Sequence, residues 1–280
     1  MRVALTPGTA GQALRDAAAY LATVSDTPRL DAELLMAHAC GLSREELILK
    51  LRDLDAPANF AALVERRGRH EPVAHITGTR DFWTLTLTVT ADVLTPRPDT
   101  ETLLEAAVAH FAGGAPQRIL DLGTGSGALL LAALDEWRDA TGLGIDASEA
   151  ALAVAQGNAA NLGMVGRATF QLGDWAQGVT EQFDLILSNP PYISTLADLP
   201  RDVVEHEPHL ALFAGEDGLD CYRIIASQIG DLLAPGGFAA IEIGYDQGES
   251  AARLFAEQGL VVRLKHDLAG HARCLCITAA

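Results

Sequence analysis

Basic residues are scarce in this sequence. Its 280 residues include 20 Lys and Arg against 37 Asp and Glu, which gives a formal net charge of -17. A protein this acidic is repelled by phosphate backbones and by anionic lipid surfaces. Aromatic residues make up only 5% of the chain, which leaves little material for platforms that stack nucleic-acid bases. The composition therefore disfavours an extensive nucleic-acid-binding surface.

Long apolar runs are also absent. The longest, over residues 128–134, is closed by Asp135, far short of the ~20 residues that a membrane span needs. The N-terminal stretch lacks the pattern of a secretion signal. The cysteines are few and scattered: Cys40, Cys221, Cys274 and Cys276. Their spacings match no common zinc framework, so we expect reduced thiols, no metal site and a cytoplasmic protein.

The hydrophobic pattern changes twice along the chain. The first ~70 residues carry helix-start signals, including capping boxes that begin at Thr9 and Ser43. Alternation of apolar residues with threonine over residues 83–90 then indicates a strand or hairpin. From about residue 118, apolar strands alternate with helical segments, which is typical of a doubly wound, mostly parallel α/β sheet. We predict a helical domain over residues 1–73, a β-hairpin linker over 74–95 and an α/β domain over 96–280.

A glycine-rich loop follows the first strand of the α/β region. It reads Asp121, Leu122, Gly123, Thr124, Gly125, Ser126 and Gly127. Glycines at such a place let the backbone approach a ligand and turn tightly into a helix. Asp146 follows the glycines by about 20 residues, where a ribose-binding acid belongs in dinucleotide sites. The loop alone would therefore fit NAD.

The acid before the glycines separates the candidate cofactors. Asp121 would repel a pyrophosphate, but it suits a ligand whose amino and sulfonium groups are positive. S-adenosylmethionine is such a ligand, and D-x-G-x-G-x-G resembles the binding loop of class I methyltransferases. Asp174 and Trp175 follow the third strand, where those enzymes present an acid and a side chain to the adenine. A helix cap at Asp174 and a core position for Trp175 are the structural alternatives.

A second motif follows the strand predicted over residues 183–188. It reads Asn189, Pro190, Pro191 and Tyr192. The Asn189 side-chain oxygen and the Pro190 carbonyl could together accept both hydrogens of a planar –NH₂, with Tyr192 packed against the flat group. An amide or aryl amine nitrogen is a weak nucleophile, so it needs orientation and charge stabilisation more than a strong base. The alternative is a purely structural role for this motif, as a rigid turn that takes no part in catalysis.

Beyond these motifs, nearly the whole chain resembles the glutamine-N5 methyltransferases that modify peptide-chain release factors. The glycine loop and N-P-P-Y are shared with other amino methyltransferases. More specific are two segments: P-R-P-D-T-E at residues 96–101, and E-P followed by G-x-D-G-L-D between residues 207 and 220.

That resemblance implies a function for the chain. The acceptor would be the side-chain amide of the glutamine in the Gly-Gly-Gln motif of the release factors, with the N-terminal helices docking that protein. The implied cofactor-binding residues are Asp121, Gly123, Thr124, Gly125, Ser126, Gly127, Asp146, Asp174, Trp175 and Asn189. Asn189, Pro190 and Tyr192 would act in catalysis, Asn189, Pro190, Pro191 and Tyr192 would hold the glutamine, and Phe82 and Arg97 would wall the site.

Other functions stay open at this point. A DNA or RNA amino methyltransferase also recognises an sp² –NH₂, but it normally carries a basic footprint, and the densest basic cluster here is confined to Arg66, Arg67 and Arg69. A dehydrogenase would leave N-P-P-Y unexplained. A non-catalytic cofactor-binding partner is a further alternative. A metal site at residues 205–209 is disfavoured because Pro208 breaks the helical spacing, and we expect a solvated loop there.

Overall fold

The computed structural model describes residues 8–280, apart from the side chain of Asp202. Contacts between residues divide the chain into two units. One holds the described residues up to Thr79 together with Leu199–His206, and the other holds Arg80–Asp198 and Glu207–Ala280. The predicted helical segment begins within residues 1–7, which lie outside the described part. The three-segment division of the chain stays a prediction.

The first unit is helical, as the pattern predicts. Its helices are α1 (Ala10–Leu21), α2 (Pro28–Cys40), α3 (Arg44–Lys50), α4 (Phe60–Arg67), α5 (Val73–Thr77) and α9 (Arg201–His206). The capping box predicted at Ser43 is confirmed, because Ser43 and Glu46 form a complete box on α3. At Thr9 only the N-cap is confirmed: the Thr9 hydroxyl accepts from the Gln12 amide, but the Gln12 side chain bonds Asp16 and Arg15 instead of returning to Thr9. The predicted basic cluster is largely paired within this unit, because Arg66 binds Glu71 and Arg67 binds Asp31.

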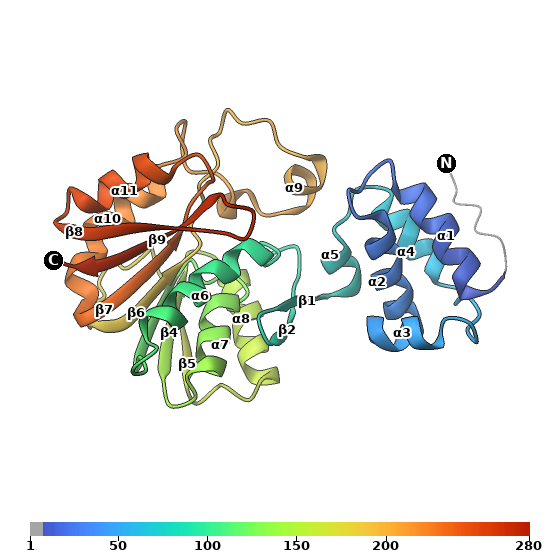
Figure 1. Ribbon diagram of the computed structural model, residues 1–280, viewed down its shortest axis with the longest axis horizontal. Helices are drawn as coiled ribbons and strands as arrows, with labels where there is room; N and C mark the ends of the chain where they lie inside the picture. The colour runs from blue at the N-terminus through green and yellow to red at the C-terminus, as the bar shows by residue number, and fades with distance from the viewer. Residues whose placement is uncertain (1–7) are drawn as a thin grey trace. The chain divides into compact units, whose positions relative to one another are not determined.

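The second unit is built on a seven-stranded sheet (Figure 1). In chain order its strands are β3 (Arg118–Leu122), β4 (Thr141–Asp146), β5 (Ala168–Leu172), β6 (Phe183–Ser188), β7 (Leu233–Glu242), β8 (Leu260–His266) and β9 (Ala272–Ala279). Their spatial order is β5-β4-β3-β6-β7-β9-β8. Strands β3 to β7 pair in parallel, and β9 runs antiparallel to both of its neighbours. The predicted mostly parallel, doubly wound sheet is confirmed.

Helices bury both faces of this sheet. One face packs on α6 (Glu101–His110), α7 (Ala128–Glu136) and α8 (Glu149–Asn161), and the other on α10 (Asp220–Leu232) and α11 (Gly248–Ala256). Along β3, Ile119 joins the first core while Leu120 and Leu122 join the second, as expected for a strand covered on both faces. None of the helices in residues 8–280 is long and apolar enough to cross a membrane.

Short elements complete the unit and lead to the site. Strands β1 (Thr79–Phe82) and β2 (Leu85–Thr88) form the predicted hairpin, and short 3-10 helices occur at η1 (Pro98–Thr100) and η2 (His209–Ala211). From β3 the chain passes to β4 and β5 on one side, then returns to β6 on the other side of β3. Leu122 and Ser188 therefore end neighbouring parallel strands, so the loops that follow them leave the sheet side by side.

Candidate active site

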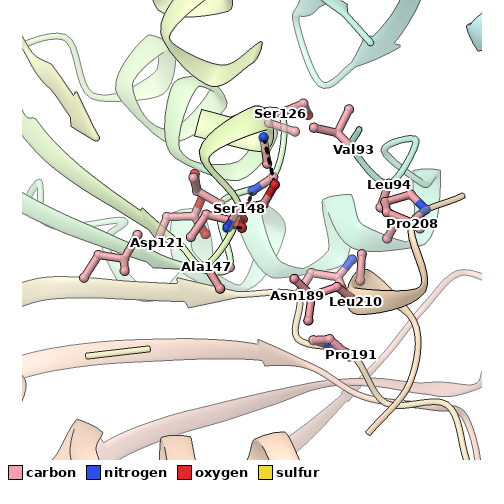
Figure 2. Close-up of a pocket in the computed structure, with 18 of the residues that line it drawn as sticks. Val93, Leu94, Asp121, Ser126, Ala147, Ser148, Asn189, Pro191, Pro208 and Leu210 are labelled. Atoms are coloured by element: carbon pink, nitrogen blue, oxygen red, sulfur yellow. Dashed lines mark hydrogen bonds between the residues drawn. The ribbon is translucent and has the colours of Figure 1, made fainter. Parts of the chain in front are cut away.

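A cavity of about 310 Å³ lies at this switch in strand order (Figure 2). Ten of the residues predicted for the site line it: Asp121, Gly123, Thr124, Gly125, Ser126, Asp146, Asp174, Trp175, Asn189 and Pro191. Gly127, Pro190 and Tyr192 are not among the lining residues, and neither are Phe82 and Arg97. Phe82 is 1% exposed and packs in the core with α6 and α7.

Asp121 places a buried carboxyl in the wall of the cavity. Its Oδ2 accepts a 2.6 Å hydrogen bond from the Thr124 hydroxyl, whereas Oδ1 is buried with no hydrogen-bond partner among the described residues. Burial raises the pKa of Asp121 to about 7; the Thr124 hydroxyl opposes this rise, and the nearby Asp146 carboxylate adds to it. A positively charged group in the cavity would satisfy Oδ1 and favour the ionised carboxyl. The site thus fits the ammonium group of S-adenosylmethionine.

Asp146 ties the glycine loop to the neighbouring strand. Its Oδ2 accepts from the Gly125 amide at 2.8 Å and its Oδ1 from the Ser148 amide at 2.9 Å (Figure 2). Each carboxylate oxygen keeps a further lone pair, so the side chain can still accept from ribose hydroxyls. Ser148 is the N-cap of α8, because its hydroxyl accepts from the Ala151 amide.

Gly127 serves the turn into α7 instead of lining the cavity. It has φ of 80°, and a Cβ there would lie 3.1 Å from Leu131 and 3.3 Å from Ala155. Glycine therefore permits both the left-handed backbone and the close approach of α7 to α8. Among the predicted cofactor residues, this one acts on the shape of the loop.

Trp175 and Asp174 close the cavity beyond β5. Trp175 is half-buried and has a left-handed backbone with φ of 52°. This conformation is rare for a bulky residue, and residues that adopt it cluster at functional sites. A Cβ on Gly123 would lie 3.7 Å from its indole, so the ring stands over the glycine loop. No helix begins at Asp174, and the helix-cap alternative for that residue is wrong.

The Asn189 side chain is anchored by one atom. Its Nδ2 donates to the Thr100 hydroxyl oxygen at 3.1 Å, which leaves Oδ1 as the acceptor of this amide. Thr100 ends η1, is 4% exposed and also lines the cavity. In the sequence this threonine stands within the P-R-P-D-T-E segment, where nothing predicts a role for it. A single polar residue in an extended, proline-rich segment carries no local signal for such a contact.

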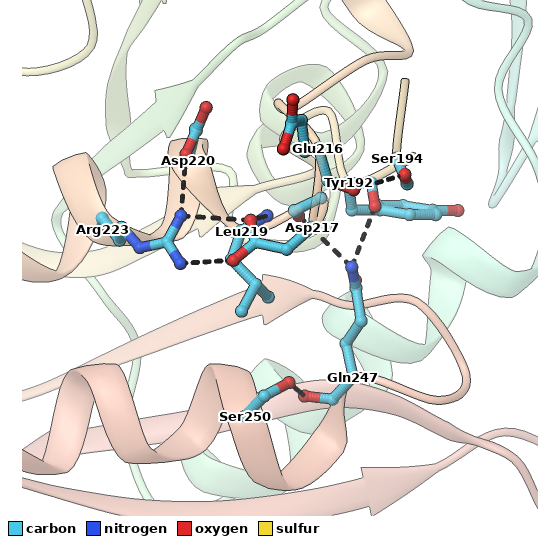
Figure 3. Close-up of polar contacts among 10 residues, drawn as sticks. Tyr192, Ser194, Glu216, Asp217, Leu219, Asp220, Arg223, Gln247 and Ser250 are labelled. Carbon is cyan, nitrogen blue, oxygen red and sulfur yellow. Dashed lines mark hydrogen bonds and ion pairs between the residues drawn. The ribbon is translucent and has the colours of Figure 1, made fainter. Parts of the chain in front are cut away.

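Tyr192 is held from two directions. Its hydroxyl donates to Glu242 Oε1 at 3.3 Å, and its backbone carbonyl accepts from Gln247 Nε2 at 2.9 Å (Figure 3). Burial and the Glu242 carboxyl both raise the pKa of the Tyr192 phenol far above its usual value. The phenol therefore stays neutral and serves as a donor to Glu242.

The G-x-D-G-L-D segment braces the same loop. Gln247 Nε2 also donates to the Gly218 carbonyl at 3.2 Å, which joins that segment to Tyr192. A Cβ on Gly218 would collide with the Tyr192 carbonyl oxygen and lie 2.7 Å from Gln247 Nε2. Arg223 holds the turn itself through Asp217 and Asp220 (Figure 3). The motif thus supports the N-P-P-Y loop from behind.

Arg97 and Glu207 form a clamp between two distant segments. One terminal nitrogen of Arg97 donates to both oxygens of Glu207, at 2.8 and 2.7 Å. The Glu207 side chain is only 1% exposed, and burial raises its pKa while Arg97 opposes the rise. The solvated loop expected over residues 205–209 is therefore wrong at Glu207, which turns inward to reach Arg97.

Comparisons with known proteins agree with this geometry. A model described as the PrmC N-terminal domain matches residues 12–78, and one described as a methyltransferase domain matches residues 115–259. Among solved structures, the hMettl16 catalytic domain has a TM-score of 0.53 at 11% identity, covering 79% of this chain and 82% of that one. The ribosomal protein L11 methylase from Lactobacillus delbrueckii subsp. bulgaricus has a TM-score of 0.50 at 22% identity, covering 67% and 81%. Both show the class I methyltransferase fold.

Curated relatives extend over most of the chain. A release factor glutamine methyltransferase from Caulobacter vibrioides is 46% identical over 255 residues, covering 89% of this chain and 88% of the relative. Another from Cereibacter sphaeroides is 45% identical over 272 residues, covering 94% and 96%. With its methyltransferase fold and a cavity suited to S-adenosylmethionine, the chain belongs to the release factor glutamine methyltransferase family.

Proposed function

We propose that this protein transfers a methyl group from S-adenosylmethionine to the side-chain amide nitrogen, N5, of the glutamine in the Gly-Gly-Gln motif of peptide-chain release factors. Such a modification would modulate translation termination. The observation that carries the proposal is the Asn189 amide, which is tied down through Nδ2 and keeps Oδ1 as an acceptor beside the Asp121 cavity. An acceptor at that place suits an –NH₂ group brought next to the methyl donor.

The cofactor side of the cavity has one residue for each part of the donor. Asp121 would hold the methionine ammonium, Asp146 the ribose hydroxyls, and Asp174 with Trp175 the adenine. When bound, S-adenosylmethionine supplies an electrophilic methyl group on its sulfonium. The product left after transfer would be S-adenosylhomocysteine.

The acceptor side orients the glutamine. Asn189 Oδ1 and the Pro190 carbonyl would each accept one hydrogen of the glutamine –NH₂, and Tyr192 and Pro191 would pack against the flat amide. Two fixed acceptors hold the nitrogen in line for attack and stabilise the positive charge that builds on it. The amide then needs no strong base before transfer, and its proton can leave afterwards.

The partner would be a class I release factor. The protein would act in the cytoplasm, where that partner works. The protein itself would be a monomer. The net charge of -17 opposes the main alternative, methylation of adenine N6 or guanine N2 in DNA or RNA. Within the first unit, pairing of Arg66 with Glu71 and of Arg67 with Asp31 neutralises most of the basic cluster that could contact a phosphate backbone.

The test offers purified protein and labelled S-adenosylmethionine to three acceptors in parallel. These are a release factor, its variant with the Gly-Gly-Gln glutamine changed to alanine, and duplex DNA. Label on the release factor alone is the expected result. Label on DNA, or undiminished label on the alanine variant, would overturn the proposal. Cofactor binding without label on any acceptor would favour the non-catalytic alternative.

A further inference from the structure

One buried polar side chain, Asn158 on α8, belongs to none of the motifs above. It is 1% exposed. Its Oδ1 accepts from the Thr88 amide at 2.8 Å, and its Nδ2 donates to the Thr88 carbonyl at 3.0 Å and to the Ser126 carbonyl at 2.9 Å. A side-chain amide has two hydrogens, and both are used here. Asn158 therefore joins two backbone segments that are distant along the chain.

The two segments that Asn158 joins both form walls of the cavity. Ser126 belongs to the glycine loop, is 3% exposed and lines the cavity (Figure 2). Thr88 ends β2 and leads into residues 89–96, the wall segment. The wall segment contributes to the cavity lining Asp92, Val93, Leu94 and Pro96. Asn158 itself is not among the lining residues, so it connects the two walls from outside the cavity.

The contact with Thr88 fixes the point where the wall segment begins. Asn158 gives the Thr88 backbone one N–H and one C=O hydrogen bond, the pair that a residue of a neighbouring antiparallel strand would give. At the other end of the wall segment, Arg80 Nε donates to the Pro96 carbonyl at 3.1 Å. The wall segment is therefore held at both ends by side chains, and Asn158 alone of the two also reaches the glycine loop.

The contact with Ser126 completes the support of the glycine loop. From the β4 side, Asp146 accepts from the Gly125 amide at 2.8 Å, and from the α8 side, Asn158 donates to the Ser126 carbonyl. The bond to Ser126 is buried, so removal of the Asn158 amide would take a hydrogen bond from a carbonyl that lies away from water. The glycine loop and the wall segment would then have to move apart to satisfy their backbone groups.

We propose that Asn158 is a positioning residue of the cofactor cavity. It fastens the wall segment to the glycine loop, and the spacing of these two walls sets the affinity for S-adenosylmethionine. Because Asn158 does not line the cavity, it acts on binding only through the Thr88 and Ser126 backbone. A cavity whose walls are held in place before binding loses less freedom when the cofactor enters. This inference concerns the methyl donor and does not depend on the identity of the acceptor.

The first experiment measures the Kd for S-adenosylmethionine by isothermal titration. Asn158→Ala removes all three hydrogen bonds and should raise Kd about tenfold. Asn158→Asp keeps the volume and an acceptor for the Thr88 amide, but its carboxyl has at most one hydrogen for two carbonyls, so Kd should rise about fivefold or more. A Kd within about twofold of the wild type in both variants would refute the inference. This measurement needs no release factor, so it stands apart from the test of the proposed function.

A matched core variant separates positioning from stability. Leu134 on α7 is fully buried and does not line the cavity. Leu134→Ala leaves a void that destabilises the fold, while Asn158 and its partners stay in place. At a temperature where circular dichroism shows all variants folded, Leu134→Ala should keep Kd within about twofold. If it weakened binding as much as Asn158→Ala does, lost stability would account for both effects and the positioning role would be wrong.

The second experiment follows amide hydrogen exchange by mass spectrometry. In Asn158→Ala the wall segment and the glycine loop should exchange about tenfold faster, because the hydrogen bonds that hold them are gone, while β3 to β7 should exchange as in the wild type. Unchanged exchange in the wall segment would contradict the inference. A uniform rise over the whole sheet would do the same, because it would show a general loss of stability.

Methyl transfer to the release factor adds a kinetic readout, the only one that depends on the proposed function. In Asn158→Ala the KM for S-adenosylmethionine should rise in step with Kd, and kcat at saturating cofactor should stay within about twofold of the wild type. A fall in kcat with an unchanged KM would place the effect of Asn158 on the acceptor side and would overturn its assignment to the cofactor.

Discussion

The two sides of the cavity are held by different means. On the cofactor side, backbone groups do most of the work: the amides of Gly123 and Thr124 donate to the Ile145 carbonyl, and the Gly125 amide donates to Asp146, 21 residues away. On the acceptor side, side chains from distant segments hold the loop. Asn189 reaches Thr100 across 89 residues, and the Tyr192 carbonyl reaches Gln247 across 55.

This difference separates binding from turnover. A backbone cradle of glycines tolerates few changes, because its conformation depends on positive φ at Gly123, Gly125 and Gly127. The acceptor loop depends on side-chain hydrogen bonds, each of which can be removed while the sheet is left intact. We expect changes on one side to alter cofactor affinity and changes on the other to alter kcat, and the following predictions test that separation.

The largest effect is expected for Asn189→Ala. The change removes an acceptor that would strengthen its contact in the transition state, so kcat should fall about 100-fold or more. The Kd for S-adenosylmethionine should stay within about tenfold, because Asp121 and Asp146 still hold the cofactor. Isothermal titration and steady-state kinetics measure the two quantities. Asn161→Ala, at the exposed end of α8, is the matched control and should change neither. A loss confined to cofactor affinity would contradict the separation.

Asp121→Asn should act on the other side of the cavity. At pH 8 wild-type Asp121 is ionised and attracts the cofactor's ammonium, so the neutral variant should bind about tenfold or more weakly. Wild-type affinity should fall as pH drops below about 7, the pKa of Asp121, while affinity of the variant should stay flat between pH 6 and 8. Equal pH dependence in both proteins would remove Asp121 from this role.

The same substitution gives a stability control. The pKa of Asp121 is about 7 in the fold against 3.8 ordinarily, so the fold binds this proton more tightly than the unfolded chain does. The contribution of protonated Asp121 to the free energy of unfolding is complete below pH ~4 and is lost as pH rises through 7. Asp121→Asn should therefore raise the free energy of unfolding at pH 8 by about 1–3 kcal/mol without cofactor. Denaturant titration at pH 5 and pH 8 measures the free energy of unfolding of the variant and the wild type. If Asp121→Asn proves less stable than the wild type, its weak cofactor binding would be explained by misfolding instead of by the lost charge.

Gly218→Ala should disturb the N-P-P-Y loop at the Tyr192 backbone. Its Cβ would strike the Tyr192 carbonyl, and φ of 72° is strained for alanine, so kcat should fall about fivefold to tenfold. Gly157→Ala is the matched control, because nothing lies within 4 Å of its Cβ in the middle of α8. That change should instead raise the free energy of unfolding by about 0.5–1 kcal/mol. Equal kinetics for the two variants would show that the brace has no effect on turnover.

Arg97→Ala should give the smallest loss. It leaves the buried Glu207 carboxyl without its guanidinium partner, but Arg97 is 44% exposed and its side of the pair is screened by solvent. We expect a loss of about 1 kcal/mol in the free energy of unfolding, measured by chemical denaturation. Arg97→Ala combined with Glu207→Gln should recover part of that loss. A double variant less stable than Arg97→Ala would mean that the Glu207 charge is satisfied by other groups.

Much of the fold was predictable because its signals are local. The N-cap at Thr9, the capping box at Ser43 and the strand pattern of β3 to β9 each depend on a few neighbouring residues. Reasoning from family likeness was less reliable for single side chains. Phe82, expected to wall the site, lies in the core, and Arg97 pairs with Glu207 and is not among the residues that line the cavity.

By itself, the sequence determined the order of strands and helices along the chain, the tight turn of the glycine loop and the place of both motifs at strand ends. Those features follow from backbone preferences and hydrophobic period over short stretches of chain. Only the tertiary structure decided which residues support the motifs: Thr100, Glu242, Gln247 and Gly218 reach the N-P-P-Y loop, and Glu207 reaches Arg97 across 110 residues. The physical reason is that a side-chain hydrogen bond forms wherever the sheet order brings two groups together, and separation along the chain carries no mark of it.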